Sequence, residues 1–399
     1  MDVMTSKLQK LLSSITIIAS FLCAASVAIG QQTGTKTQNV SAAVATAVVE
    51  KQPELKDNKS DNSTKPASSQ KPDYIQPEWS RRLSRWFELQ TAMVYTQYRV
   101  IENTSGVLTK NTLEHKETFL GRFKFDAAGN YTINAFVQSG TGFISSWNNT
   151  GAGLGDMRTN LSLKQAYFAA KPVQGLEIQY GGLFLNRGQS TEITSYDNDG
   201  YIVGERVSVK RPKELYLDEI SVTYGYLGDS SLPNLDKRFH RLTKSNYHQF
   251  LVAKKVGDRV SLSADYTFEA GRETMREAVK VNARELHVVD FLRFENYQRF
   301  DTTTVYGFAA YGEKQLRKRV AVGGGYASID RYYGGLNADR FGNGNRLFAN
   351  ATVKLVQDLS TTIYVTRAVG NDYALGQKTR MDLLVSYDLL AGLRRMGLY

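Results

Sequence analysis

From residue 87 onward, apolar and polar residues alternate with a period of two. The clearest case is 259–269, where Val260, Leu262 and Ala264 share one side with two aromatic residues, and serine, aspartate, threonine and glutamate share the other. Successive side chains of a β-strand point to opposite faces, so this pattern predicts strands with one apolar and one polar face.

The same alternation recurs along the rest of the chain, between segments rich in turn-forming residues. We predict fourteen strands, at 87–100, 115–125, 130–145, 161–171, 176–185, 200–210, 214–227, 246–256, 259–270, 302–312, 318–330, 345–355, 359–369 and 379–389.

The predicted connections are short and long in strict alternation. The long ones are 101–114, 146–160, 186–199, 228–245, 271–301, 331–344 and 370–378. Short turns on one side and long loops on the other are typical of a transmembrane antiparallel up-and-down β-barrel, and an even strand number closes the sheet without an edge. The segment 286–297 also alternates, so counts of twelve and sixteen strands remain alternatives.

The N-terminus has the three parts of a secretory signal peptide. Lys7 and Lys10 are basic, 11–25 is mostly apolar, and the small residues Ala28 and Gly30 precede the expected cleavage point. We therefore predict a signal peptide over 1–30, with a short membrane anchor as the alternative. Cleavage there removes the single cysteine, and the rest of the chain then contains no thiol.

The next segment, 31–78, has the composition of a disordered periplasmic linker. Residues 51–71 are almost all Lys, Asp, Asn, Ser, Pro, Gln and Thr, which bury too little apolar surface to offset the entropy of ordering. The linker is either a passive spacer or a tether to the cell wall. The β-barrel is expected to occupy 79–399.

Composition and charge agree with this division. The chain has 23 Tyr and 33 Gly, which suit aromatic girdles and tight hairpins, and no apolar run after residue 30 approaches the roughly 20 residues of a membrane helix. The net charge of +11 is scattered, which speaks against nucleic-acid binding. The positive charge either meets anionic lipid headgroups or gives the lumen a preference for anions.

Charged residues on the polar faces of the strands are the candidates for lining a pore. Each is either an ordinary solvated wall residue or part of the field that selects solutes. They are Arg122, Lys124, Lys164, Asp265, Glu269, Lys354, Arg380 and Asp382, with Glu177 as a further lumen-facing residue.

The longest expected loop, 271–301, is the candidate for a constriction. It mixes charges of both signs with apolar residues, which suits a loop folded into the pore, and a mobile extracellular lid is the alternative. Its candidate residues are Arg272, Arg276, Lys280, Arg284, Asp290 and Arg293.

One segment carries a family resemblance. Tyr180-Gly-Gly-Leu-Phe-Leu-Asn-Arg-Gly-Gln-Ser-Thr-Glu192, followed by Gly204-Glu-Arg206, resembles the strand end and loop of phosphate-selective-type porins among Gram-negative outer-membrane porins. The resemblance covers about 30 residues. It implies a porin fold, but phosphate specificity is not carried over. The C-terminus differs from such porins, because a basic segment, 391–399, follows the last predicted strand.

The function expected from these features is passive diffusion of small hydrophilic solutes through the bacterial outer membrane, with a possible preference for anions. The alternatives are a substrate-specific outer-membrane transporter and a structural barrel tethered to the cell wall. Gly-x-Ser-x-Gly and His-Glu-x-x-His are both absent, so neither an enzyme nor a cofactor or metal is expected. Expected partners are outer-membrane lipid and lipopolysaccharide, the barrel-assembly machinery, small solutes and further copies of the chain.

Overall fold

The computed structural model describes the barrel part of the chain. The described residues are 85–140, 162–188, 201–210, 216–227, 239–269, 271–300, 304–330, 344–370 and 377–396. The predicted signal peptide, 1–30, and linker, 31–78, lie outside the described residues.

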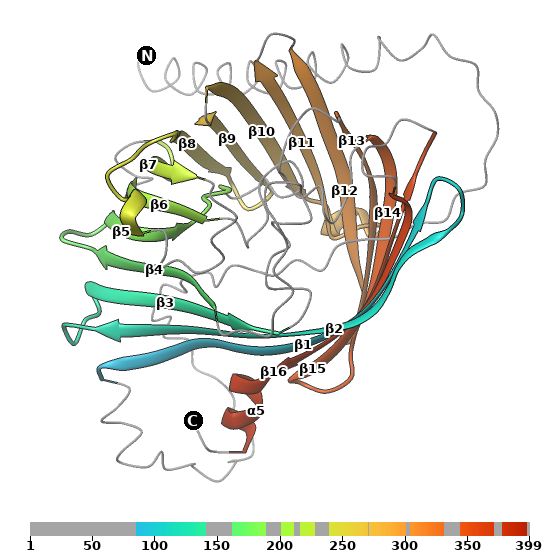
Figure 1. The fold of residues 1–399 in the computed structure, drawn as a ribbon, viewed down its shortest axis with the longest axis horizontal. Helices are drawn as coiled ribbons and strands as arrows, with labels where there is room; N and C mark the ends of the chain where they lie inside the picture. The colour runs from blue at the N-terminus through green and yellow to red at the C-terminus, as the bar shows by residue number, and fades with distance from the viewer. Residues whose placement is uncertain are drawn as a thin grey trace. The chain divides into compact units, whose positions relative to one another are not determined.

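The described residues form sixteen strands, short 3₁₀ turns at 239–241 and 284–286 (η3), and one α-helix (Figure 1). The strands are β1 (Phe87–Asn103), β2 (Leu108–Lys124), β3 (Tyr131–Ser139), β4 (Ser162–Ala170), β5 (Leu176–Phe184), β6 (Tyr201–Val209), β7 (Glu219–Leu227), β8 (Tyr247–Val256), β9 (Val260–Glu269), β10 (Arg272–Asn282), β11 (Phe291–Phe300), β12 (Val305–Arg317), β13 (Val320–Ile329), β14 (Gly344–Lys354), β15 (Leu359–Ala368) and β16 (Gln377–Asp388).

The strands close into one antiparallel up-and-down barrel. Each strand pairs with its neighbours in sequence, and β1 pairs with β16 from Met93↔Asp388 to Asn103↔Gln377. The prediction of an all-β, closed antiparallel up-and-down barrel is therefore confirmed. Closure pairs the backbone of every strand on both sides and leaves no sheet edge.

The predicted count of fourteen strands is wrong, and the difference lies in 271–301. This segment forms the hairpin β10–β11 instead of one long loop, with residues 283–290, including η3 (Arg284–Leu286), between its strands. Only residues 270–271 separate β9 from β10, so no turn-rich gap marks the boundary. Of the charged residues that suggested a loop, Arg272, Arg276, Lys280 and Arg293 have the inward parity of the two strands, whereas Arg284 and Asp290 lie in the connection.

The β1–β2 hairpin is also longer than predicted. Each strand has 17 residues, and most of the predicted loop 101–114 is part of the paired hairpin. At its tip, Asn103 Oδ1 accepts backbone N–H groups from Ser105 at 3.0 Å and Val107 at 2.9 Å. Long and short connections thus alternate less regularly than the sequence indicates.

The strands are strongly inclined to the barrel axis. Following the paired residues once around the barrel returns to β1 displaced by about 20 residues, which for sixteen strands corresponds to a tilt of about 45°. At this tilt, about 9–11 residues of a strand cross a hydrocarbon layer. The strands have 9 to 17 residues and are long enough.

Side-chain and backbone contacts fix the turns on the short-connection side. Between β2 and β3, Asp126 Oδ1 accepts the Tyr131 N–H at 2.9 Å, and Gly129 has a φ of 71°. The Tyr131 N–H bond is the main reason that the pKa of Asp126 lies below its usual value. The Gly129 φ lies in the left-handed region, which favours glycine.

A short helix, α5 (Leu389–Arg395), follows the last strand where the sequence analysis expected a basic tail. Asp388 caps it by accepting the Ala391 N–H at 2.9 Å, and Arg395 binds Asp358 at 2.9 Å. Leu390 is buried, and the helix contacts β1. The described part of the chain holds no helix that is long and apolar enough to span a membrane.

Candidate functional site

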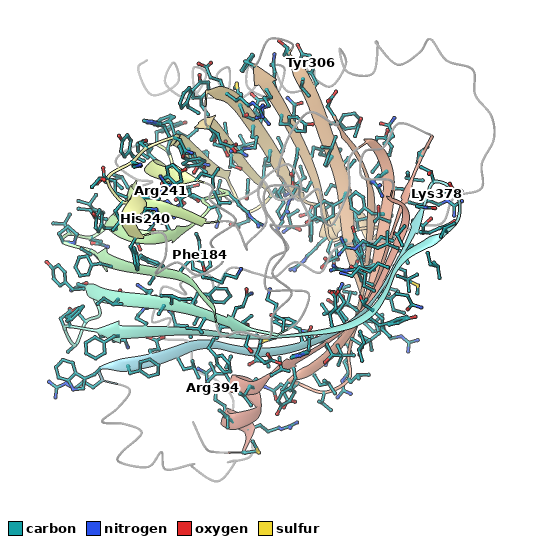
Figure 2. All side chains as sticks on the ribbon, viewed as in Figure 1. Phe184, His240, Arg241, Tyr306, Lys378 and Arg394 are labelled. Carbon is teal, nitrogen blue, oxygen red and sulfur yellow. The ribbon has the colours of Figure 1, made fainter. Side chains whose placement is uncertain are left out.

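The inner face of the barrel wall collects the polar and charged side chains. In β3, Thr132, Asn134 and Gln138 are buried, whereas Tyr131 and Ile133 are 42% and 44% exposed. The same alternation runs around the wall, and Tyr306 (57% exposed) stands on the outer side in Figure 2. Soluble proteins bury apolar residues, so this distribution is inverted.

The first cluster of inner charges spans the seam where the barrel closes. Asp382 of β16 accepts from Arg99 Nε of β1 at 3.2 Å and from Arg380 Nη2 at 2.7 Å. Glu114 of β2 lies 3.7 Å from Arg99 and 2.5 Å from Lys110. Because buried charges need partners, this network lets three strands carry ionised groups on their inner faces.

A second ion pair joins β9 to β10. Arg276 and Asp265 are directly opposite in the register, and Arg276 Nε donates to Asp265 Oδ1 at 2.8 Å. The Thr267 hydroxyl accepts from Arg276 Nη2 at 2.6 Å and donates to Asp265 at 3.1 Å. Both charged side chains are almost completely buried.

Arg206 of β6 is held differently. Its guanidinium donates to Thr223 Oγ1 at 2.9 Å, to Gln179 Oε1 at 3.2 Å and to the Phe184 carbonyl oxygen. All three acceptors are uncharged. None of these acceptors neutralises the charge of Arg206, which also interacts electrostatically with the carboxylates of Glu219 and Glu177.

Aromatic residues share the inner wall with cations on β10, β11 and β12. The Arg293 guanidinium lies 5.1 Å from the Tyr311 ring centroid and 5.9 Å from that of Phe291, and Lys280 Nζ lies 4.5 Å from Phe291. Such distances allow cation–π attraction. Tyr311 belongs to a buried apolar cluster that includes Tyr297, Phe348 and Tyr364.

The buried charges on the strands are predominantly positive. The nine basic residues are Arg99, Lys116, Lys164, Arg206, Arg276, Arg293, Arg299, Arg346 and Arg380. The four acidic residues are Glu114, Asp265, Glu295 and Asp382. Basic side chains therefore outnumber acidic ones among the buried charged residues of the strands.

The structure separates the predicted pore-lining residues into two groups. Lys164, Asp265, Arg380 and Asp382 are buried on the inner face. The others share that face by strand parity but lie nearer the strand ends: Arg122, Lys124, Glu177 and Glu269 are partly exposed and Lys354 is exposed. Glu88 lies 3.0 Å from Lys124 and 3.8 Å from Arg122.

The predicted constriction-loop residues are not on a loop, which corrects that interpretation. Arg272, Arg276 and Lys280 are on β10, and Arg293 is on β11. Arg284 begins η3, and Asp290 lies in the same short connection. There, Asp290 accepts the Gln315 N–H at 2.7 Å and lies 3.4 Å from Lys314 Nζ; the Gln315 bond is the main cause of its lowered pKa.

Several inner residues were missed at the sequence level. Arg99, Arg206 and Arg346 lie on predicted strands, opposite apolar neighbours, and the period-two pattern could have identified them. Glu114 was missed for another reason, since it was placed in a loop.

His115, the first residue of the predicted strand 115–125, lies on β2. Its Nδ1 lies 2.8 Å from Glu117 Oε1, and both residues have the outward parity of β2. In the described ranges, no group of three or more His, Cys, Asp or Glu side chains is arranged to hold a metal ion.

Comparison with known proteins gives only distant likenesses. No protein-family model matches the chain, and no curated protein matches it. A triple mutant of the Rhodopseudomonas blastica porin is 12% identical, with a TM-score of 0.48, and the match covers 76% of this chain and 99% of that one. Salmonella typhi OmpF, in complex with daunomycin, is 12% identical with a TM-score of 0.48, over 75% of this chain and 97% of that one.

Likenesses at these scores carry no argument about this chain. The barrel assignment rests on the closed strand pairing, and the candidate site is defined by its own side chains. That site is a charged inner wall with an excess of arginine and lysine, inside a barrel whose outer wall is apolar.

Proposed function

We propose that this barrel is an outer-membrane channel for small hydrophilic solutes that prefers anions. The observation that carries the proposal is the excess of nine buried cations over four carboxylates on the strands. Low-dielectric walls strengthen the field of such charges, so anions entering the lumen are favoured over cations.

The outer face supports a membrane location. Aromatic and aliphatic residues with exposed fractions of 36% or more occur on strands throughout the wall, including Phe119, Tyr180, Val222, Phe250 and Ile363. A hydrocarbon layer removes such side chains from water, and every strand has the backbone partners that this environment requires.

The lengths of the connections between strands support an orientation of the barrel in the membrane. Residues 257–259 and 318–319 make very short connections at one rim, whereas 228–246 and 330–343 make long ones at the other. In outer-membrane barrels the short connections face the periplasm. On this basis, we assign the ends at 257–259 and 318–319 to the periplasmic side.

The remaining sequence predictions belong to the same proposal. Residues 1–30 direct export as a signal peptide, 31–78 form the periplasmic linker, and lipopolysaccharide, the assembly machinery and further copies of the chain are the expected partners. Within the lumen, Lys164, Arg276, Arg293 and Arg380 are the residues we expect to attract solutes, together with Arg206.

Conductance in planar lipid bilayers tests the channel and its selectivity. The full mature protein, in a potassium chloride gradient, is expected to open in long-lived steps with a reversal potential of the sign for chloride. The control is the same preparation after thermal unfolding in detergent, which must be silent.

Two outcomes contradict the proposal at different levels. A folded barrel that never conducts overturns the channel. A reversal potential of the sign for potassium leaves the channel but overturns the anion preference.

A further inference from the structure

Two neighbouring connections at the short-connection rim form one continuous surface. Residues 318–319 join β12 to β13, and 355–358 join β14 to β15. The Lys354 N–H donates to the Arg319 carbonyl at 2.8 Å, and Arg319 Nη1 donates to the Leu355 carbonyl at 3.2 Å. These two bonds hold the connections side by side.

Exposed cations and exposed aliphatic residues are interleaved on this surface. Leu316, Leu355 and Val356 are 57%, 48% and 43% exposed. Arg317, Lys318 and Arg319 are also exposed. We call these six residues the basic rim.

The cations of the basic rim are not neutralised by the carboxylates in the adjoining connections. Asp290 is bonded to the Gln315 N–H and to Lys314, and Asp358 is buried and bound by Arg395. Within the described ranges, no carboxylate pairs with the side chains of Arg317, Lys318 or Arg319, and the Arg319 guanidinium donates to the uncharged Leu355 carbonyl. Their charge is therefore available to an external anion.

The rim differs from the β2–β3 end of the barrel at the same level. There, Lys124 lies 3.0 Å from Glu88, and the connection carries Asp126, Gly129 and two alanines. The β2–β3 end thus lacks the run of exposed cations found at the basic rim.

We propose that the basic rim binds the headgroup of an anionic phospholipid in the adjacent membrane leaflet. This inference rests on the proposed membrane function. The three cations match a phosphate-bearing headgroup, and the three aliphatic side chains match the boundary between headgroups and acyl chains. A free phosphate or a soluble polyanion would use the cations and leave Leu316, Leu355 and Val356 in water, so a lipid fits the surface better.

Native mass spectrometry of the full mature protein tests this site. The protein is taken from neutral detergent micelles containing equal amounts of phosphatidylglycerol and phosphatidylcholine, and the lipids retained on the folded barrel are counted. Wild type is expected to retain phosphatidylglycerol preferentially. The triple variant Arg317→Gln, Lys318→Gln, Arg319→Gln is expected to lose that preference by about tenfold or more, because each cation near an anionic headgroup contributes substantially to binding.

A matched variant removes the same charge from the opposite rim. Lys244→Gln, Arg367→Gln, Lys378→Gln changes three cations near the long connections and is expected to retain phosphatidylglycerol like wild type. Equal retention by both triple variants overturns the local site. A second variant, Leu316→Ser, Leu355→Ser, is expected to weaken lipid retention with all charges present, and unchanged retention together with binding of inorganic phosphate overturns a lipid as the ligand.

Conductance of the same preparations in phosphatidylcholine bilayers separates this inference from the proposed function. Normal conductance without any preference for phosphatidylglycerol overturns the lipid site alone. A folded wild-type barrel that does not conduct overturns the channel. In that case the comparison of phosphatidylglycerol retention between the two triple variants still tests whether the lipid site exists.

Discussion

The inner and outer faces of the barrel wall use alternate residues of the same strands under opposite physical conditions. On β10, Arg276 is buried and bonded to Asp265 and Thr267, whereas its neighbour Met275 is 38% exposed and points outward. On β16, Asp382 binds two guanidinium groups, and Leu383 beside it is 37% exposed.

The contrast shows how each face is stabilised. An inner charge is tolerated because a partner of opposite charge or a set of polar acceptors surrounds it. Removing one partner leaves the other charge buried without compensation. An outer side chain has no specific partner, so its contribution depends on the apolar medium that we propose surrounds the barrel. Adjacent positions should therefore respond differently to the same substitution.

The largest effect is expected from breaking the buried ion pair of β9 and β10. Arg276→Leu leaves the buried Asp265 with only uncharged partners, Thr267 and Gln249, which should lower the free energy of unfolding by about 3–5 kcal/mol. Met275→Leu, one residue away on the outer face, is the control and should change it by less than about 1 kcal/mol. Urea unfolding of the barrel in lipid vesicles measures both, and equal losses would contradict the contrast between the faces.

A smaller effect is expected from placing a charge on the outer face. Leu383→Arg on β16 puts a guanidinium into the proposed hydrocarbon layer, at a cost of about 2–4 kcal/mol near its midplane. Leu384→Arg faces the interior, beside Asp382 and Ser386, and should cost less than Leu383→Arg because polar groups and water are within reach. The same unfolding assay compares them, and a larger loss for Leu384→Arg would argue against a polar lumen.

Ion selectivity should depend on the charges of the inner face and not on those of the outer face. Arg206 and Glu205 are adjacent on β6, but Arg206 is buried inside and Glu205 is exposed outside. Arg206→Gln should move the reversal potential toward that of the cation, whereas Glu205→Gln should leave it unchanged. If both variants shift the potential equally, the field that selects ions does not arise from the inner wall.

The smallest effect is expected at a turn, which belongs to neither face. Asp290 has a lowered pKa in the folded protein because it accepts the Gln315 N–H and lies beside Lys314. The unfolded carboxyl has a pKa near 3.9, so the stabilisation is complete above about pH 5 and is lost as the pH falls through the folded value. Asp290→Asn should unfold at a urea midpoint slightly below that of wild type at pH 6, and the difference should shrink toward pH 3; a constant difference would assign the effect to something other than ionisation.

The period-two pattern was sufficient to predict most strands of the barrel, and its wrong predictions are confined to separate segments of the chain. It placed Lys164, Asp265, Arg380 and Asp382 on the faces that the structure buries. It failed at 271–301, where a two-residue connection left no turn-rich boundary and a dense set of charges imitated a loop. It also failed at 101–114, where residues 108–116 of β2 pair with β1 alone among the described residues and show little apolar alternation.

Partners across the sheet could not be predicted from the sequence. Arg99 and Asp382 are 283 residues apart, and they meet only because β1 pairs with β16 in one register. A shift of that register by one residue would place each side chain on the opposite face. The excess of inner cations could likewise not be separated from the charge of the whole chain until each residue was assigned to a face.

The sequence by itself determined that the chain forms strands with one polar and one apolar face, because side chains alternate at every residue whatever the pairing. Only the tertiary structure decided the number of strands, the closure of β1 on β16 and the pairing of the inner charges. Those features depend on backbone hydrogen bonds between distant segments, and such bonds connect the same N–H and C=O groups in every residue, so they leave little trace in the order of the side chains.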